Sequence, residues 1–138
     1  MSVLVALVAG AAVTRANDLP PAKIGTVTIG QNQSEVEAAM GAPLRRVSTG
    51  DALDPELQYE GLSVWLWDGG PVAEIRSSSS QHCTPDDICP GMKLKAAETR
   101  LASRSLGEST YKVDAETCWL KIESDGDVIG ALYIKCQP

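Results

Sequence analysis

The side chains best suited to metal binding or catalysis lie in one short segment, which contains His82, Cys83, Asp86, Asp87 and Cys89. Thiolates and an imidazole can bind zinc, but paired zinc-binding cysteines are usually separated by about two to four residues, whereas five residues separate these two. A Cys–His catalytic pair is also disfavoured, because adjacent residues of an extended chain point in opposite directions. Residues 84–88 (TPDDI) are typical of a turn. We therefore predict a small loop closed by a disulfide, with a zinc site as the alternative.

The other two cysteines, Cys118 and Cys136, lie on strand-like segments on either side of residues 124–127 (SDGD). With a three-residue hairpin loop, Cys118 faces Ile134 and is diagonal to Cys136 on one face of the sheet. A diagonal pair is close enough for a disulfide where the strands twist or bulge. An even number of cysteines behind an export signal also favours disulfides. We predict the pairs Cys83–Cys89 and Cys118–Cys136.

The rest of the sequence gives little support for catalysis. Asp86 and Asp87 are adjacent carboxylates, which do not face a common substrate and are typical of a solvated turn. No Gly-x-Ser-x-Gly motif is present, so His82 has no nucleophile of that kind. Gly69 and Gly70 belong to a hairpin turn rather than to a strand–loop–helix phosphate site. We therefore predict a protein that is not an enzyme and binds no cofactor or metal.

Length and composition are those of one folded domain. The chain has 138 residues, of which 43% are apolar, a fraction too high for a largely disordered protein. It carries 12 basic and 18 acidic side chains, a net charge of −6. This acidic balance argues against binding to nucleic acids or anionic membranes, and no apolar run reaches the roughly 18 residues of a membrane span. We expect neither nucleic-acid binding nor membrane insertion.

Residues 1–16 are predicted to be a secretory signal peptide. Residues 3–13 are an uninterrupted apolar run, and Thr14 and Ala16 are small residues at the −3 and −1 positions of a cleavage before Asn17. A buried first strand or helix is the alternative. No lipobox cysteine is present, so we expect a soluble periplasmic or secreted protein without a lipid anchor. Cleavage removes Arg15 and changes the net charge from −6 to −7, which favours a partner with a basic surface.

Two segments with the same order of elements make up the remainder. In the first, Asn32 and Glu35 predict a helix start with a capping box, and Gly41 predicts its end. In the second, a similar helix is expected between Gly91 and Gly107. The apolar stripes expected to be buried are Val36, Ala39 and Met40 in the first helix and Leu94, Ala97 and Leu101 in the second.

A β-hairpin is predicted after each helix, because an Asp-Gly turn separates two apolar runs. The strands and turns are expected at residues 57–67, 68–71 and 72–76, and at residues 117–123, 124–127 and 128–135. The expected fold is α+β. A single domain over residues 17–138 consists of two helix-plus-hairpin repeats at about 24–77 and 83–136, with the helices packed on one face of an antiparallel sheet.

Alternation along these strands predicts an aromatic surface on the sheet. Leu62, Val64 and Leu66 share the face that belongs against the helices. The opposite face is expected to carry five of the six aromatic residues: Tyr59, Trp65, Trp67, Trp119 and Tyr133. Trp and Tyr are enriched at binding hot spots, and interspersed charges such as Lys121 favour exposure over burial. Coverage of the rings by another segment is the alternative.

The first segment resembles a known envelope module. The residues that carry the resemblance are Ile29-Gly30, Ser34-Glu35-Val36, Met40-Gly41 and Pro43, then Tyr59-Glu60-Gly61-Leu62, and the Asp-Gly hairpin with Val72 and Ile75. This pattern is similar to that of the SmpA/OmlA outer-membrane-assembly lipoproteins and of the beta-lactamase inhibitory proteins, which contain it as a tandem duplication. The similarity covers roughly residues 24–135. The second helix lacks the Glu-Val pair and the closing Gly-x-Pro, and the chain lacks the lipidated cysteine of the assembly lipoproteins.

The resemblance implies an α+β module that acts by protein–protein contact, with aromatic residues on a concave sheet face gripping the partner. Inhibition of beta-lactamases belongs to individual members and is not carried over. We expect a non-catalytic periplasmic or secreted module that binds an envelope or secreted protein through its aromatic sheet face. A structural subunit of an envelope assembly complex and a small-ligand (glycan) binding protein are the alternatives.

Overall fold

A computed structural model describes residues 19–113 and 117–137 of the chain. The predicted signal peptide at residues 1–16 lies outside these ranges. Within them, no helix has the length and apolar character needed to cross a membrane. Strands make up 44% of the described residues and helices 16%, so the fold is mostly β.

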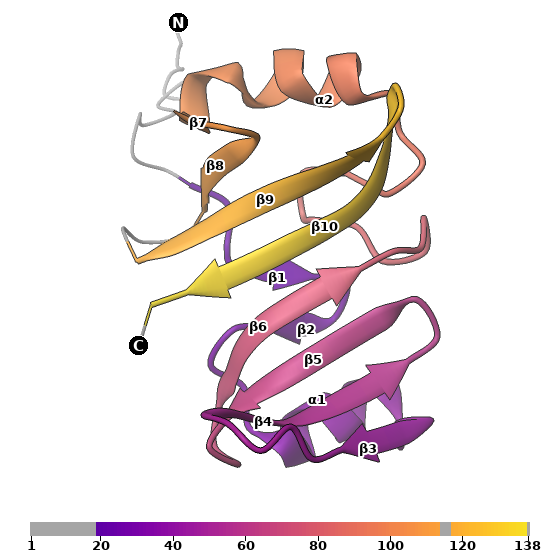
Figure 1. Cartoon of the computed structure of the whole chain (residues 1–138), viewed down its shortest axis with the longest axis vertical. Helices are drawn as coiled ribbons and strands as arrows, with labels where there is room; N and C mark the ends of the chain where they lie inside the picture. The colour runs from indigo at the N-terminus through magenta and orange to yellow at the C-terminus, as the bar shows by residue number, and fades with distance from the viewer. Residues whose placement is uncertain (1–18, 114–116, 138) are drawn as a thin grey trace, which may run out of the picture.

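Eight strands form one antiparallel sheet, and a separate two-stranded hairpin lies beside it (Figure 1). The strands of the sheet are β3 (Arg45–Val47), β4 (Leu53–Tyr59), β5 (Leu62–Trp67), β6 (Val72–Ser77), β7 (Ser105–Gly107), β8 (Thr110–Val113), β9 (Cys118–Asp125) and β10 (Val128–Cys136). Their order across the sheet is β3-β4-β5-β6-β10-β9-β8-β7. The hairpin consists of β1 (Lys23–Ile24) and β2 (Val27–Thr28). The pairing of β6 with β10 therefore joins the strands of the two parts of the chain into one sheet.

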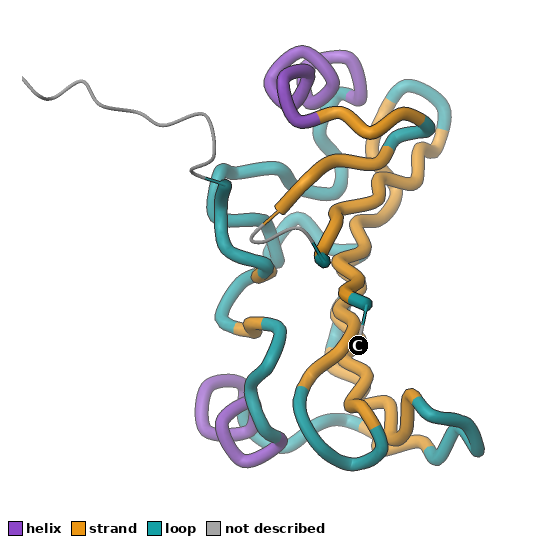
Figure 2. The backbone as a smooth tube through the Cα atoms, turned by 90° about the vertical axis from the view of Figure 1, so that its left-hand side faces the viewer, coloured by secondary structure: helices purple, strands orange, loops and turns teal. Residues whose placement is uncertain are grey.

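The described part of the chain covers only one side of the sheet (Figure 2). Helix α1 (Gln33–Met40), the β1–β2 hairpin and the connecting loops lie on this covered side. Helix α2 (Leu94–Leu101) lies at one end of the molecule and is followed by a short 3-10 helix, η2 (Ala102–Arg104). The backbone N–H of Leu94 donates to the carbonyl of Asp127 at 2.8 Å, which attaches α2 to the β9–β10 turn. The opposite side of the sheet, which faces the viewer in Figure 1, is called the open face.

The predicted α+β fold of two helix-plus-hairpin repeats is wrong. Each part of the chain contributes four strands rather than two, and all eight belong to one sheet. Each α-helix has only eight residues, and loops and a small hairpin provide much of the layer that covers the sheet. The missed strands include β3, β7 and β8, and most of β4. The sequences LDPELQY in β4 and SLG in β7 contain proline, glycine or exposed polar positions, which weaken the alternation that identifies strands.

The strand predicted at residues 57–67 is in fact two strands. The chain turns at Glu60 and Gly61, so that Tyr59 at the end of β4 pairs directly with Leu62 at the start of β5. Gly61 has a φ of +72°, and a Cβ there would lie 2.4 Å from the Cβ of Ser79, so only glycine fits. Directly paired residues share a sheet face. Tyr59 therefore lies with Leu62 on the covered face.

The predicted start of α1 is confirmed. The side-chain oxygen of Asn32 accepts a hydrogen bond from the backbone N–H of Glu35, and the carboxylate of Glu35 accepts one from the backbone N–H of Asn32, both at 2.9 Å. Val36 is fully buried as predicted, whereas Ala39 is exposed. Helix α2 begins after Lys93 without a side-chain cap.

One hydrophobic core lies between the sheet and the covering layer, and it continues across the β6–β10 junction. A row of directly paired aliphatic residues spans five strands: Leu57, Val64, Ile75, Ile134 and Leu120. The covering layer contributes Ile24, Val27, Val36, Ile88, Ala97 and Leu101, all fully buried. Burial of each larger aliphatic side chain stabilises the fold by about 1.5–3 kcal/mol relative to exposure. This core fixes the position of every central strand.

Both predicted disulfides are present. Cys83 and Cys89 close a small loop, with their Cα atoms 4.5 Å apart, and Cys118 and Cys136 join β9 to β10, with their Cα atoms 4.0 Å apart. The second pair is directly opposite rather than diagonal. The hairpin loop contains two residues instead of three, and a bulge at Gly130 shifts the register by one position.

Candidate functional site

Two rows of side chains cross the open face from β8 to β4. The strand registers place Lys112, Trp119, Lys135, Glu74, Trp65 and Glu56 in one row, and Thr110, Lys121, Tyr133, Arg76, Ser63 and Gln58 in the next. Direct and diagonal neighbours in such rows are within reach of aromatic and long side chains. The rings of Trp65, Trp119 and Tyr133, with the charged side chains among them, are called the aromatic face.

Two rings of the aromatic face form a pair across β6. The ring centroids of Trp65 and Tyr133 are 6.3 Å apart, and their planes differ by 22°. Near-parallel rings at this separation attract each other by roughly 0.5–1.5 kcal/mol beyond their burial. Both side chains are partly exposed. The pair therefore presents a preformed apolar surface at the middle of the sheet.

Two cations lie over the ring of Tyr133. The guanidinium carbon of Arg76 is 5.5 Å from the ring centroid, and the Nζ of Lys135 is 5.3 Å from it. A cation at this distance from a partly exposed ring contributes about 0.5–1 kcal/mol. Arg76 also pairs with the carboxylate of Glu123 at 3.4 Å. These contacts hold the charged side chains in place around the ring.

Burial and neighbouring charges perturb one carboxylate of this face. Glu74 lies between Lys135 and Trp65 in the first row. Burial raises the pKa of Glu74, the negative charge of Asp51 raises it further, and Lys135 opposes the change. The carboxylate is thus partly desolvated beside the Trp65 ring.

The structure brings together three of the five aromatic residues predicted for binding. Trp65, Trp119 and Tyr133 lie on the open face, and Trp67 lies at its edge with 38% of its surface exposed. The grouping of Tyr59 with them is wrong. Its hydroxyl donates to the carbonyl of Gly41 at 2.9 Å on the covered side. Burial, and secondarily the charge of Glu37, raises the pKa of this phenol.

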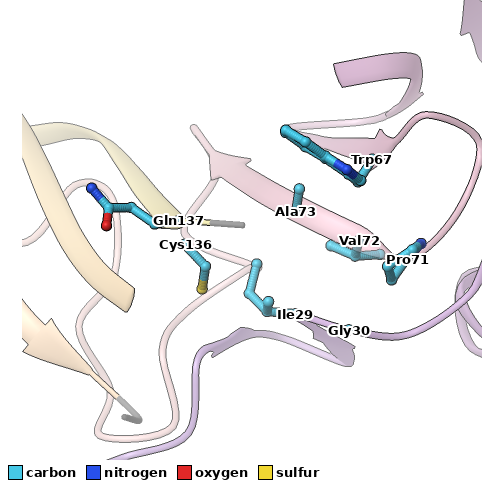
Figure 3. A pocket seen from close by; sticks show the side chains of 8 residues that line it. All are labelled: Ile29, Gly30, Trp67, Pro71, Val72, Ala73, Cys136 and Gln137. Carbon is cyan, nitrogen blue, oxygen red and sulfur yellow. The ribbon is translucent and has the colours of Figure 1, made fainter. Parts of the chain in front are cut away.

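A cavity of about 370 Å³ lies beside Trp67 (Figure 3). The pairing of β6 with β10 ends at Glu74 and Lys135, and beyond this point Val72 exchanges backbone hydrogen bonds with residues 30–31. The cavity occupies the place where the two strands separate. Its lining is mostly apolar and consists of Ile29, Gly30, Trp67, Pro71, Val72, Ala73, Cys136 and Gln137. Figure 3 shows Cys136 across the cavity from the side chains of Val72 and Ala73.

The segment with His82 is part of the framework of the fold. Cys83 and Cys89 are joined to each other, and the Nε2 atom of His82 lies 3.0 Å from the carbonyl oxygen of Glu60. The carboxylate of Asp86 accepts a hydrogen bond from the hydroxyl of Thr84 and pairs with Arg104. No cluster of three or more potential metal ligands occurs in residues 19–113 and 117–137. The side chains of this segment thus fasten the loop to its surroundings.

Alternation along the predicted strands placed Lys121 on the aromatic face, but Arg76 and Lys112 were missed. Arg76 and Glu74 alternate with Ile75 on β6, but a bulge at Ala73 interrupts the pattern. Lys112 lies on β8, a strand that was not predicted. The alternation of apolar and charged residues in Lys112-Val113 and Glu74-Ile75-Arg76 is the signal that could have placed them.

Comparison with known protein families finds none that matches this sequence, and comparison with curated proteins also finds no match. Among solved structures, the fold is similar to part of an extracellular protein containing a SCP domain from Bacillus anthracis str. Ames, with a TM-score of 0.62 and 13% sequence identity. The similarity covers 79% of this chain and 44% of that protein's chain. At this identity the likeness concerns the fold alone.

Proposed function

We propose that this protein is a non-catalytic binding module of the periplasm or the extracellular space, and that its aromatic face contacts a protein partner. The observation that carries the proposal is a sheet face that the described part of the chain leaves uncovered, on which Trp65, Trp119 and Tyr133 are partly exposed among charged side chains. Trp and Tyr bury a large area on binding and keep a polar group for hydrogen bonding. A surface that combines these aromatic side chains with flanking charges suits a protein partner.

The rigidity of the aromatic face supports this function. Its rings project from central strands whose other side is packed in the core, and the Cys118–Cys136 disulfide joins two of those strands. The stacking of Trp65 on Tyr133 already restricts both side chains in the free protein. Less conformational entropy is then lost on binding, which raises affinity for a given contact area.

The disulfides support the proposed location. Both cysteine pairs are oxidised, and no free cysteine occurs in the described part of the chain. Disulfides form and persist mainly in oxidising compartments such as the bacterial periplasm or the extracellular space. The disulfides support this location whether or not residues 1–16 are a signal peptide.

Binding of a small ligand is a second candidate function, and the cavity beside Trp67 favours it. Its volume of about 370 Å³ is within the range of small-molecule sites. Its apolar lining suits an apolar molecule better than a glycan. A change of Trp67 fluorescence with small apolar compounds, absent in Trp67→Phe, would support this candidate.

The main test uses the full chain as bait against secreted and envelope proteins of its own source cell. Trp65→Ala and Trp119→Ala are compared with wild type, and any captured protein is then purified and titrated calorimetrically. Loss of a hot-spot ring costs about 2 kcal/mol or more, which is about a thirtyfold loss of affinity.

Leu44→Ala and Leu106→Ala provide matched controls. These side chains are 73% and 54% exposed, and they lie beside β3 and in β7 at the two edges of the sheet. They should leave affinity unchanged. A partner that binds both tryptophan variants as tightly as wild type, with the fold intact by circular dichroism, would refute the proposal.

A further inference from the structure

We propose, resting on the function proposed above, that the surface recognised by the aromatic face is acidic, and that Lys112, Lys121, Lys135 and Arg76 select it. This is the opposite of what the net charge indicates. The whole chain carries −6 and favours a basic partner. The charge of the binding face itself governs close contact, because exposed charges more than about 8 Å apart are largely screened at physiological salt.

The charges on the aromatic face are separated along the sheet. Over β8, β9, β10 and β6, the two rows contain four cations and a single carboxylate, that of Glu74. After Lys121, the next residue of β9 that lies on the open face is Glu123, and its carboxylate pairs with Arg76. The part of the face that contains Trp119 and Tyr133 is therefore positive, whereas Glu56 and Glu74 flank Trp65.

The lysines of this region are available for a partner. Lys112 and Lys121 are exposed, and neither forms a salt bridge within residues 19–113 and 117–137. Lys112 is paired with Trp119 across the strands, and Lys121 with Tyr133. Each ring thus has a lysine beside it, and Trp119 has a second one, Lys135, on its other side. If an apolar side chain of the partner stacks on Trp119 or Tyr133, a carboxylate beside it on the partner would lie next to the ammonium group of a lysine.

A protein partner fits this pattern better than an extended polyanion. A nucleic acid or an anionic membrane would bring negative charge against Glu74 and Glu123 as well as against the lysines. It would also meet the remaining acidic surface of a chain with 18 acidic side chains. A folded acidic protein can limit its carboxylates to the positive part of the face.

The test uses three short synthetic peptides that share the same phenylalanines and differ only in their remaining residues, which are glutamate, lysine or serine. Binding to the full chain is followed by the indole signals of the tryptophans in nitrogen–proton NMR spectra at low salt. We expect the glutamate peptide to bind at least about tenfold more tightly than the serine peptide. The lysine peptide should bind most weakly, and high salt should reduce the difference.

Charge-removal variants locate the effect. In the triple variant Lys112→Gln, Lys121→Gln and Lys135→Gln, affinity for the glutamate peptide should fall about tenfold or more. The matched control, Lys23→Gln with Lys93→Gln and Lys95→Gln, removes the same charge from β1 and from the start of α2, away from the open face. Its affinity should change less than about twofold.

The outcomes separate this inference from the proposed function. If the serine or lysine peptide binds as tightly as the glutamate peptide and Trp119→Ala abolishes binding, the acidic partner is refuted and the binding face stands. If no peptide binds in a way that depends on Trp119, the acidic partner is refuted, and the proposed function is decided separately by the binding of the captured partner to Trp65→Ala and Trp119→Ala. If single-stranded DNA or phosphatidylglycerol vesicles bind more tightly than the glutamate peptide and lose binding in the first triple variant, the face selects polyanions and the inference is overturned.

Discussion

The side chain of Asp86 attaches the Cys83–Cys89 loop to the 3-10 helix η2, which follows α2, and its charge should contribute measurably to stability. Its carboxylate accepts a hydrogen bond from the hydroxyl of Thr84 at 2.7 Å and pairs with the guanidinium of Arg104. The substitution Asp86→Asn preserves the shape of the side chain and one acceptor oxygen but removes the charge. The contact with Arg104 then becomes a weaker hydrogen bond from the charged guanidinium to a neutral amide oxygen.

The magnitude follows from the partial exposure of the pair. A hydrogen bond to a charged group contributes about 1.5–3 kcal/mol to stability. The side chains of Arg104 and Asp86 are 16% and 30% exposed, so solvent screens part of their attraction. We expect Asp86→Asn to lower the free energy of unfolding by about 1–1.5 kcal/mol at neutral pH.

The effect should depend on pH in a defined direction. Partial burial alone would raise the pKa of Asp86, but the hydrogen bond from Thr84 and the charge and hydrogen bond of Arg104 outweigh burial and lower it. A carboxyl group with a lowered pKa in the folded state stabilises the fold above its unfolded pKa, near 3.9. This contribution is lost as the pH falls through the lower folded value.

Urea unfolding followed by tryptophan fluorescence measures the effect at neutral pH and in strong acid. Asp87→Asn is the control, because Asp87 is exposed and its φ of +64° is tolerated by asparagine. The control should differ from wild type by less than about 0.5 kcal/mol. A stabilising role of the Asp86 charge is refuted if Asp86→Asn has the same free energy of unfolding as wild type at neutral pH. It is also refuted if the loss of stability is as large in acid as at neutral pH.

Three further predictions concern the framework of the fold, and denaturant unfolding checks each of them. Gly61→Ala should lower the free energy of unfolding by at least about 2 kcal/mol, because φ is positive there and the new Cβ would clash with Ser79. Gly69→Ala has a similar φ of +74° but open space around it, so it should cost only about 1 kcal/mol. Equal losses in the two variants would contradict the clash. Replacing Cys118 and Cys136 by alanine should lower the free energy of unfolding by about 3 kcal/mol, and replacing Cys83 and Cys89 by about 2 kcal/mol, because the second disulfide closes a shorter loop. A larger loss for the shorter loop would be inconsistent with this cause. Tyr59→Phe should cost about 1 kcal/mol by removing its hydrogen bond on the covered side and should not affect partner binding; weaker binding would place Tyr59 in the interface.

Local signals in the sequence predict several parts of the structure. The spacing of Asn32 and Glu35 identifies the start of α1, because a capping box depends only on neighbouring residues. The two Asp-Gly turns identify the β5–β6 and β9–β10 hairpins, and the second hairpin brings Cys118 next to Cys136. These features require no knowledge of the rest of the chain.

Features that depend on distant parts of the chain were missed. Nothing local indicates that β6 pairs with β10, which joins all eight strands into one sheet. Alternation assigns residues to the two faces only within a single strand. The turn between β4 and β5 was not recognised, and for this reason Tyr59 was assigned to the wrong side of the sheet. Bulges at Ala73 and Gly130 shift the register, so the rows that place Lys135 beside Glu74 and Trp119 follow only from the folded sheet.

The open face of the sheet is the proposed binding site for the partner. The most direct measurement is a titration of the isotope-labelled protein with its purified partner, in which the indole N–H signals of the three tryptophans are followed after assignment with Trp→Phe variants. We expect the signals of Trp65 and Trp119 to shift in proportion to the bound fraction. Saturated binding that leaves both signals unchanged, with shifts confined to the sheet edges around Leu44 or Leu106, would contradict it.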